Sequence, residues 1–141
     1  MKPTDPDCVF CKIVAGEIPA HTVYRDDNFI AFLDIAPVAS GHTLLVPIAH
    51  VGALHEMPVE HLAGLSIVLP TVGAAVVKAT GADGWNLLAN TGACAGQLVQ
   101  HVHFHLIPRR ASETARLVNW HPHEVAQEEL AEMRRKIETA L

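Results

Sequence analysis

The segment 100–110 places a histidine at every second position, and this alternation constrains the fold more than any other feature of the chain. A period of two is typical of a β-strand, whose successive side chains point to opposite faces. His101, His103 and His105 would then share one face, spaced roughly 6.5 Å apart, while the apolar residues between them point inward. The row favours metal ligation or imidazole catalysis. The alternative is a histidine-rich surface strand without a function.

Composition fits one globular domain in the cytoplasm. The 141 residues are 50% hydrophobic, which suffices for a single core, so we expect one domain over residues 1–141. A formal charge of -5 argues against the basic footprint that a nucleic-acid polymer requires. The N-terminal residues lack the apolar segment of a signal peptide, and no uninterrupted apolar run reaches the roughly 18 residues of a membrane span. We therefore expect neither a nucleic-acid partner nor a membrane.

Turn signals and hydrophobic periodicity predict five strands and three helices. The strands are expected around residues 23–24, 29–33, 43–47, 84–90 and 101–108. The helices are expected at residues 9–14, from Pro58 to Gly81, and at 124–140. Strands that follow one another through short connections predict an antiparallel sheet packed against helices, which is an α+β fold.

Four ordered blocks around the histidine row carry a resemblance to a known family. The row lies in "GQLVQHVHFHLIPR", and the blocks are "CVFCKIVAGEIPA", "AFLDIAPVASGHTLLVPIAHV", "NTGACAGQ" and "NWHP". The chain resembles the histidine triad (HIT) family, in its bacterial branch with a Cys-x2-Cys zinc site. The resemblance implies a nucleotidyl hydrolase or transferase acting at the α-phosphate of nucleoside phosphoramidates or dinucleoside polyphosphates, with adenine as the expected base. It also implies a five-stranded sheet that pairs into ten strands in a homodimer.

The resemblance assigns a catalytic part to each histidine of the triad. His103 would attack phosphorus and become the nucleotidyl-histidine, since neutral imidazole is a good nucleophile. His105 would donate a hydrogen bond to a phosphate oxygen or the leaving group, and His101 completes the catalytic set. A backbone carbonyl should accept from the other nitrogen of His103 and fix its tautomer. The rival interpretation is a catalytic zinc held by the triad, with an open position for water.

The substrate would be held by residues from two further blocks. The resemblance places Phe10, Ile13, Phe32 and Ile35 around the base, Asp34 at the ribose, His42 behind the triad, and Asn90, Gly96, Gln97 and Leu98 at the phosphate. Small residues in this loop allow backbone amides to approach an anion. Spacing alone equally fits plain core residues and a turn-capping Asp34. Leu98 stands where many relatives have Ser or Thr, which keeps open a nucleotide-binding module with little activity.

The spacing Cys8-x2-Cys11 suits two thiolates that grip one tetrahedral ion, although it also fits a redox pair. An odd number of cysteines, 3 in all, argues against a disulfide framework. The resemblance adds His50 and His101 and implies a closed Cys2His2 shell with a structural zinc; the alternative is a pair of free buried thiols. Cys94 is either a small loop residue or an oxidation-sensitive thiol. The remaining histidines are expected on the surface, with a metal pair at His121 and His123 as the alternative.

The expected fourth strand, "GWNLLAN", is apolar and contains no proline, so as an edge strand it needs a cover. The long helix offers more apolar surface than one packed stripe requires; the residues concerned are Leu65, Val68, Leu69, Val72, Ala75 and Val76. A twofold contact between two chains would bury both features. The alternative cover is the C-terminal helix of the same chain.

Overall fold

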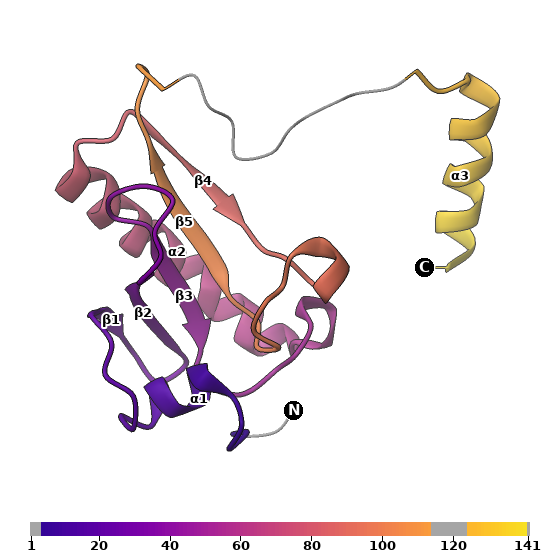
Figure 1. Cartoon of the computed structure of the whole chain (residues 1–141). Coiled ribbons are helices and arrows are strands. Elements are labelled where there is room, and N and C mark those ends of the chain that lie inside the picture. The colour runs from indigo at the N-terminus through magenta and orange to yellow at the C-terminus, as the bar shows by residue number, and fades with distance from the viewer. Residues whose placement is uncertain (1–3, 114–123, 141) are drawn as a thin grey trace.

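The structure is a computed structural model, and it describes residues 4–113 and 124–140. Its centre is an antiparallel sheet of five strands in the order β1-β2-β3-β5-β4 (Figure 1). The strands are β1 (Thr22–Arg25), β2 (Phe29–Leu33), β3 (Thr43–Pro47), β4 (Gly84–Leu88) and β5 (Phe104–Arg109). The helices are α1 (Val9–Val14), α2 (Val59–Thr80) and α3 (Gln127–Ala140), with 3-10 turns η1 (Leu54–Glu56) and η2 (Ala93–Ala95). The predicted α+β fold is confirmed.

Local chemistry explains where several elements begin and end. The Asp26 carboxylate accepts from the amides of Asn28 (2.8 Å) and Phe29 (2.7 Å), which closes the β1–β2 turn as an Asx turn. β3 ends at Pro47, as predicted, because proline has no N–H for the ladder. α2 starts after Pro58 and ends at Gly81, whose φ of 63° is the left-handed conformation of a helix C-terminus.

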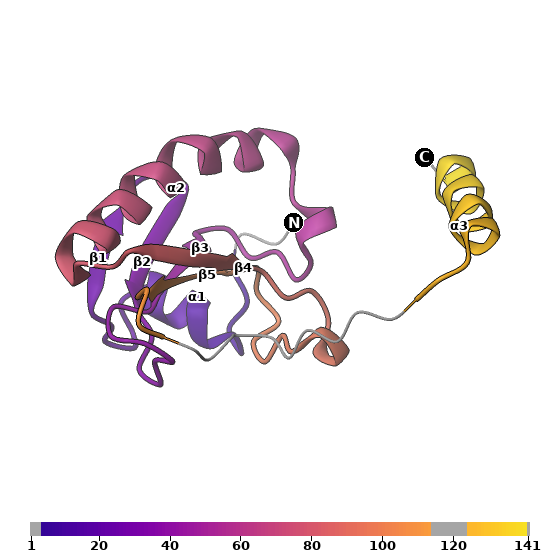
Figure 2. The same ribbon diagram turned by 90° about the horizontal axis from the view of Figure 1, so that it is seen from above.

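The sheet separates two apolar clusters, one on each face. Figure 2 shows α2 along one face and the short α1 against the other. The larger cluster, on the α2 face, contains Phe29, Leu45, Val68, Val72, Val102, Phe104 and Leu106, among others. The smaller cluster, on the α1 face, contains Cys8, Phe10, Cys11, Ile30, Phe32, Leu44 and Val46. The triad histidines alternate with members of the larger cluster, so they lie on the α1 face.

The strand predicted from the histidine row is shorter than expected. β5 begins at Phe104, so only His105 of the triad lies within the strand. The residues before it use their amides elsewhere: His101 N donates to Val99 O (2.8 Å) and Val102 N to Val51 O (2.7 Å). These bonds turn the backbone away from the sheet ladder. The prediction of a strand from residue 101 was wrong, although the alternation of faces persists.

β4 is an edge strand, and no part of the described chain covers it fully. Trp85 packs against Gly73 of α2 yet stays 38% exposed, and Leu87 is 46% exposed. α3 has no buried residue, and Figures 1 and 2 show it apart from the sheet. The alternative in which α3 covers β4 within one chain is therefore not what the structure has.

α2 is the one helix among the described residues that is long and apolar enough to cross a membrane by length and composition. Its valines Val68, Val72 and Val76 pack in the larger core cluster against the sheet. Core helices of this length pass the same test of hydropathy. Packing against the sheet explains part of this apolar character, since 22% of the most apolar window is buried.

Candidate active site and metal centre

His103 is buried, and its surroundings fix its tautomer. Its Nδ1 lies 2.7 Å from the backbone carbonyl oxygen of His101, so Nδ1–H donates to that oxygen. The lone pair of a neutral ring is then on Nε2. Phe10 packs edge-on against the ring, with centroids 5.2 Å apart. The arrangement presents one imidazole nitrogen with a free lone pair on the α1 face.

His105 is held by a second histidine through a chain of two hydrogen bonds. The Val38 amide donates to His42 Nδ1 (3.2 Å), so the His42 proton is on Nε2. That Nε2–H donates to His105 Nδ1 at 2.9 Å, which leaves the His105 proton on its own Nε2. The His103 and His105 rings are 4.9 Å apart. A nitrogen with a lone pair and a nitrogen with a proton thus lie on adjacent rings.

Burial keeps His105 and His42 neutral. Burial, aided by His103 and His42 and opposed by Asp34, lowers the pKa of His105 to about 4. Burial also lowers the pKa of His42, against the opposing effect of the Asp34 carboxylate. Both rings are therefore uncharged near pH 7, as the hydrogen-bond chain requires. The Asp34 carboxylate lies 3.6 Å from His42 Nε2, and this contact joins a carboxylate to a neutral ring.

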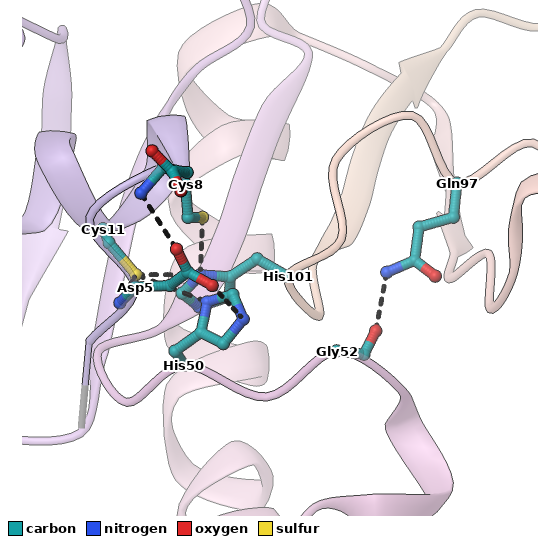
Figure 3. Close-up of polar contacts among 8 residues, drawn as sticks. Asp5, Cys8, Cys11, His50, Gly52, Gln97 and His101 are labelled. Atoms are coloured by element: carbon teal, nitrogen blue, oxygen red, sulfur yellow. Dashed lines mark hydrogen bonds and ion pairs between the residues drawn. The ribbon is translucent and has the colours of Figure 1, made fainter. Parts of the chain in front are cut away.

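The two predicted cysteines and two predicted histidines form one cluster, drawn in Figure 3. Their ligand atoms lie within 4.8 Å of one another. The sulfur–nitrogen distances are 3.3 Å for Cys8–His101, 3.4 Å for Cys11–His50 and 3.7 Å for Cys11–His101, each to Nδ1. In a zinc tetrahedron with ordinary bond lengths, sulfur and nitrogen are about 3.6 Å apart. The residues therefore fit a closed tetrahedral zinc site.

The burial of the cluster also favours a cation. Burial raises the pKa of the Cys8 thiol, so a thiolate there needs a positive partner. His101 is completely buried, and its Nε2–H donates to Pro47 O at 2.9 Å, which leaves Nδ1 to face the sulfurs. Burial lowers the pKa of His101 to about 4, so the ring is neutral, as a ligand must be. Both ring nitrogens of His101 therefore have partners, Nδ1 at the sulfurs and Nε2 at Pro47 O.

Asp5 borders the cluster, and it was not among the residues predicted from the sequence. Its carboxylate lies 3.8 Å from His50 Nε2, and its amide donates to Cys11 Sγ at 3.3 Å (Figure 3). Carboxylates in this position orient metal-bound imidazoles. The only signal in the sequence was its place three residues before Cys8.

The triad does not converge on a single ion. Among the described residues, His101 belongs to the cysteine cluster, His105 groups with Asp34 and His42, and His103 belongs to neither group. Two nitrogens that bind one tetrahedral zinc are about 3.3 Å apart, whereas His42 Nε2 and His105 Nδ1 are only 2.9 Å apart. That distance is an ordinary hydrogen bond. The geometry does not favour the rival with a catalytic zinc on the triad.

The residues predicted around the nucleoside lie in different surroundings. Phe10 and Phe32 are in the smaller core cluster, with Ile13 packed against it, whereas Ile35 is 93% exposed. Asp34 accepts from the Ala36 amide at 2.9 Å, which is the turn-capping contact. These four apolar residues thus do not form one closed slot in the single chain.

The loop between β4 and β5 is shaped by glycine and by one buried glutamine. Gly92 and Gly96 have φ values of 89° and 92°, which only glycine adopts readily. Gln97 is 3% exposed and turned into the protein, whereas Asn90 Nδ2 makes only a long contact of 3.4 Å to Gly96 O. Leu98 is 94% exposed and borders a hollow of about 380 Å³, whose lining includes Val9, His50, Val99 and Gln100. Cys94 is an exposed free thiol in this loop. His121 and His123 lie outside the described residues.

Comparisons with known proteins agree with this geometry. The HIT domain family matches residues 15–112. An Arabidopsis thaliana protein named adenylylsulfatase HINT3 is 46% identical over 104 residues, which are 74% of this chain and 53% of the relative. The chain thus spans about half of that relative. The Schizosaccharomyces pombe adenosine 5'-monophosphoramidase hnt1 is 39% identical over 134 residues, covering 95% of this chain and 98% of the relative.

Solved structures of related proteins have the same fold as this chain. A Streptococcus mutans protein superposes with a TM-score of 0.92 at 41% identity, over 99% of this chain and 88% of that one. A zinc-bound histidine triad family protein from Mycobacterium smegmatis superposes with a TM-score of 0.74 at 35% identity, over 96% and 98% of the two chains. The matched residues include the triad, His42 and His50. On this evidence the chain belongs to the histidine triad (HIT) family.

Proposed function

We propose that the protein is a nucleotidyl hydrolase or transferase that acts at the α-phosphate through a covalent intermediate on His103. The observation that carries the proposal is the pair of assigned tautomers on adjacent rings. His103 offers a lone pair on Nε2, while His105 offers a proton on Nε2. A nucleophile and a hydrogen-bond donor side by side suit displacement at phosphorus.

The reaction would run in two displacements. In the first, His103 Nε2 forms a bond to the α-phosphorus, and the bond from phosphorus to the amine or phosphate leaving group breaks. His105 Nε2–H donates to the leaving group or to a phosphate oxygen as negative charge develops there. The ring of His103 becomes positively charged, and its Nδ1–H···O bond to His101 stabilises that charge. In the second, water or another acceptor attacks phosphorus, and the bond to Nε2 breaks, which returns the His103 ring to its neutral form. The attacking oxygen loses its proton to the solvent, which also supplies the proton that a departing amine takes up.

The proposed substrates are adenylyl compounds, either nucleoside phosphoramidates or dinucleoside polyphosphates. Support comes from the relatives, which are named as an adenylylsulfatase and an adenosine 5'-monophosphoramidase. Both names describe an adenosine phosphate joined to a leaving group. We assign the base to Phe10, Ile13, Phe32 and Ile35, the ribose to Asp34, and the phosphate to the loop that contains Asn90, Gly96, Gln97 and Leu98. The second candidate is a binding module with little activity, because Leu98 offers no hydroxyl to phosphate at a position where Ser or Thr would.

The proposal extends to zinc, to assembly and to location. A zinc ion on Cys8, Cys11, His50 and His101 would cross-link the N-terminal segment to two distant parts of the chain, as a structural site. The uncovered β4 edge supports a homodimer whose sheets join into ten strands. We also propose a cytoplasmic protein of one domain over residues 1–141, with a nucleotide as its small-molecule partner.

The direct test is mass spectrometry of the protein mixed with adenosine phosphoramidate and quenched without acid. A nucleotidyl adduct on His103 is the expected result. His103→Ala should lack the adduct and lose turnover by a factor on the order of 10⁴ or more, and His105→Ala should slow turnover by about 10² to 10⁴. His55→Ala, at an exposed histidine of η1, is the matched control and should retain full activity. A His103→Ala variant that keeps more than about a tenth of turnover would refute the nucleophile.

A further inference from the structure

The side chain of Gln97 connects two loops that are far apart in the sequence. Its Oε1 accepts from the Gly92 amide at 2.7 Å, and its Nε2 donates to the Gly52 carbonyl at 2.8 Å (Figure 3 shows the second bond). The residue is only 3% exposed. Because a backbone group occupies each end of the amide, the side chain ties the two loops together.

Gly52 belongs to a segment that begins with a residue of the metal cluster. His50 Nδ1 lies 3.4 Å from Cys11 Sγ, within the four-residue cluster. Val51 O accepts from Val102 N at 2.7 Å, next to the triad. Three successive residues thus have three different partners: His50 the cluster, Val51 the triad segment, and Gly52 the side chain of Gln97. Gln97 belongs to the loop of residues 90–98, which we call the phosphate loop. The Gly52 carbonyl is only two residues from His50, so a short stretch of backbone joins the metal cluster to the partner of Gln97.

The other end of the connection is the turn of the phosphate loop. Residues 93–96 are exposed, and two of the backbone bonds within the loop end at Gly92 O, from Ala95 N at 3.0 Å and from Gln97 N at 3.2 Å, while Gly96 N donates to Ala93 O at 3.0 Å. The Gly92 amide is itself held by Gln97 Oε1. Few other contacts hold this turn, because its side chains are small and lie outside the core clusters. Its conformation therefore depends on Gln97 more than on packing.

We propose that Gln97 is a positioning residue that couples the metal cluster to nucleotide binding. A metal on the four ligands fixes His50, which directs the Gly52 carbonyl to Gln97, and Gln97 then holds Gly92 in the conformation that receives phosphate. Linkage makes the effect reciprocal, so bound nucleotide must raise the affinity of the cluster for metal by the same factor. This inference rests on the proposed nucleotide site, and it adds a second task for the cluster beyond stabilising the fold.

The test measures zinc affinity by equilibrium competition with a chromophoric chelator, with and without AMP. In the wild-type protein, AMP should raise zinc affinity by about 10-fold, within the usual range of coupling between sites. Gln97→Glu keeps an oxygen for the Gly92 amide but loses the N–H that Gly52 accepts. With AMP at ten times the Kd of each variant, the AMP effect in Gln97→Glu should fall below about twofold. Gln100→Ala, which removes one long contact of 3.4 Å in the same loop, should behave as wild type.

Two results would overturn the coupling: no AMP effect in the wild-type protein, or a full effect in Gln97→Glu. If the wild-type protein binds no AMP, the proposed function fails, and the coupling is then judged by hydrogen exchange at the Gly92 amide. Removing zinc should speed that exchange by about 10-fold in the wild-type protein, in line with a local opening. Equal exchange rates with and without zinc would reject the connection through Gln97.

Discussion

The Nε2 atom of His42 lies 2.9 Å from Nδ1 of His105, and His42 is itself oriented by the Val38 amide. The backbone carbonyl of His101 likewise fixes the tautomer of His103, because it accepts from the Nδ1–H of that ring. Two neighbouring imidazoles are therefore set to opposite tautomers by a backbone carbonyl and by a buried side chain. These two bonds support the proposed roles, with His103 as the nucleophile and His105 as the hydrogen-bond donor.

Removing His42 should slow the chemical step while leaving nucleotide binding intact. His42→Leu takes away the N–H that fixes the His105 tautomer, so kcat should fall by about 10-fold to 10²-fold, a part of what an acid–base group contributes. His42→Gln can place an amide N–H near the same point and should recover much of the loss. Steady-state kinetics with an adenosine phosphoramidate measures both variants. A kcat for His42→Leu within twofold of wild type would show that His105 needs no such partner.

Lowering the pH should reduce the free energy of unfolding already at pH values above those at which the carboxylates are protonated. The pKa of His105 is about 4 in the folded protein and about 6.5 in an unfolded chain. Between these values the unfolded chain binds a proton that the folded protein does not, so the free energy of unfolding falls as the pH drops from 6.5 toward 4. The lowered pKa of His42 adds to the same trend.

Denaturant unfolding at several pH values, compared between wild type and His105→Phe, isolates this contribution. The variant should show a shallower loss of stability in the same pH window, because the group that takes up the proton on unfolding is gone. NMR titration of the wild-type imidazoles should find His105 neutral down to below pH 5. Identical pH slopes in the two proteins would contradict the assignment.

Asp5 should strengthen metal binding although it is outside the ligand set. Its carboxylate is 3.8 Å from His50 Nε2, and loss of such a partner typically costs 10-fold to 100-fold in metal affinity. Elemental analysis should find one zinc per chain in the wild-type protein. Chelator competition should then show weaker zinc binding, with a lower Tm, for Asp5→Ala. Asp7→Ala, two residues along the same segment, is the control, and equal affinities for the two variants would remove Asp5 from the site.

The β4 edge should mediate self-association. Leu87 is 46% exposed on the α2 face of an edge strand, so Leu87→Lys would place a charge in a twofold contact there. Sedimentation at micromolar concentration should give about twice the mass of the 15.2 kDa chain for wild type, and the single mass for the variant. Val59→Lys, at a residue 77% exposed at the start of α2, should leave the mass unchanged. A wild-type protein that sediments as a single chain would exclude the homodimer.

The sequence predicted elements best where local chemistry ends them. Asp26 closes a turn with its own carboxylate, Pro47 cannot continue a ladder, and Gly81 adopts a left-handed conformation, so the neighbouring boundaries were predictable. The start of β5 was not, because it depends on a bond from Val102 to Val51, 51 residues earlier in the chain. Alternation identifies the faces of a segment but not whether its backbone joins a sheet.

The candidate site shows the same division between local and distant causes. The Cys8-x2-Cys11 spacing indicated a metal, yet the choice of His50 and His101 as partners came from family resemblance. The inward direction of Gln97 follows from a carbonyl 45 residues away. No pattern in the sequence reveals such a contact. The exposure of Ile35 likewise depends on which segments cover it in three dimensions.

Because the α1 helix is short, most substitutions in it should have little effect on its attachment to the sheet, whereas substitutions at Cys8 and Cys11 should have a large effect. A helix of six residues has little stability of its own, and α1 buries only Phe10 and Cys11. α2, by contrast, spreads its attachment over four buried residues along 22 positions, so no single replacement there removes all of its anchorage. In α1 the exposed Val9 carries little of the attachment, and many residue types should be accepted in its place. A replacement of Cys11 would instead remove one of the two buried anchors of the helix, and a replacement of either Cys8 or Cys11 would take one of the four residues from the metal cluster.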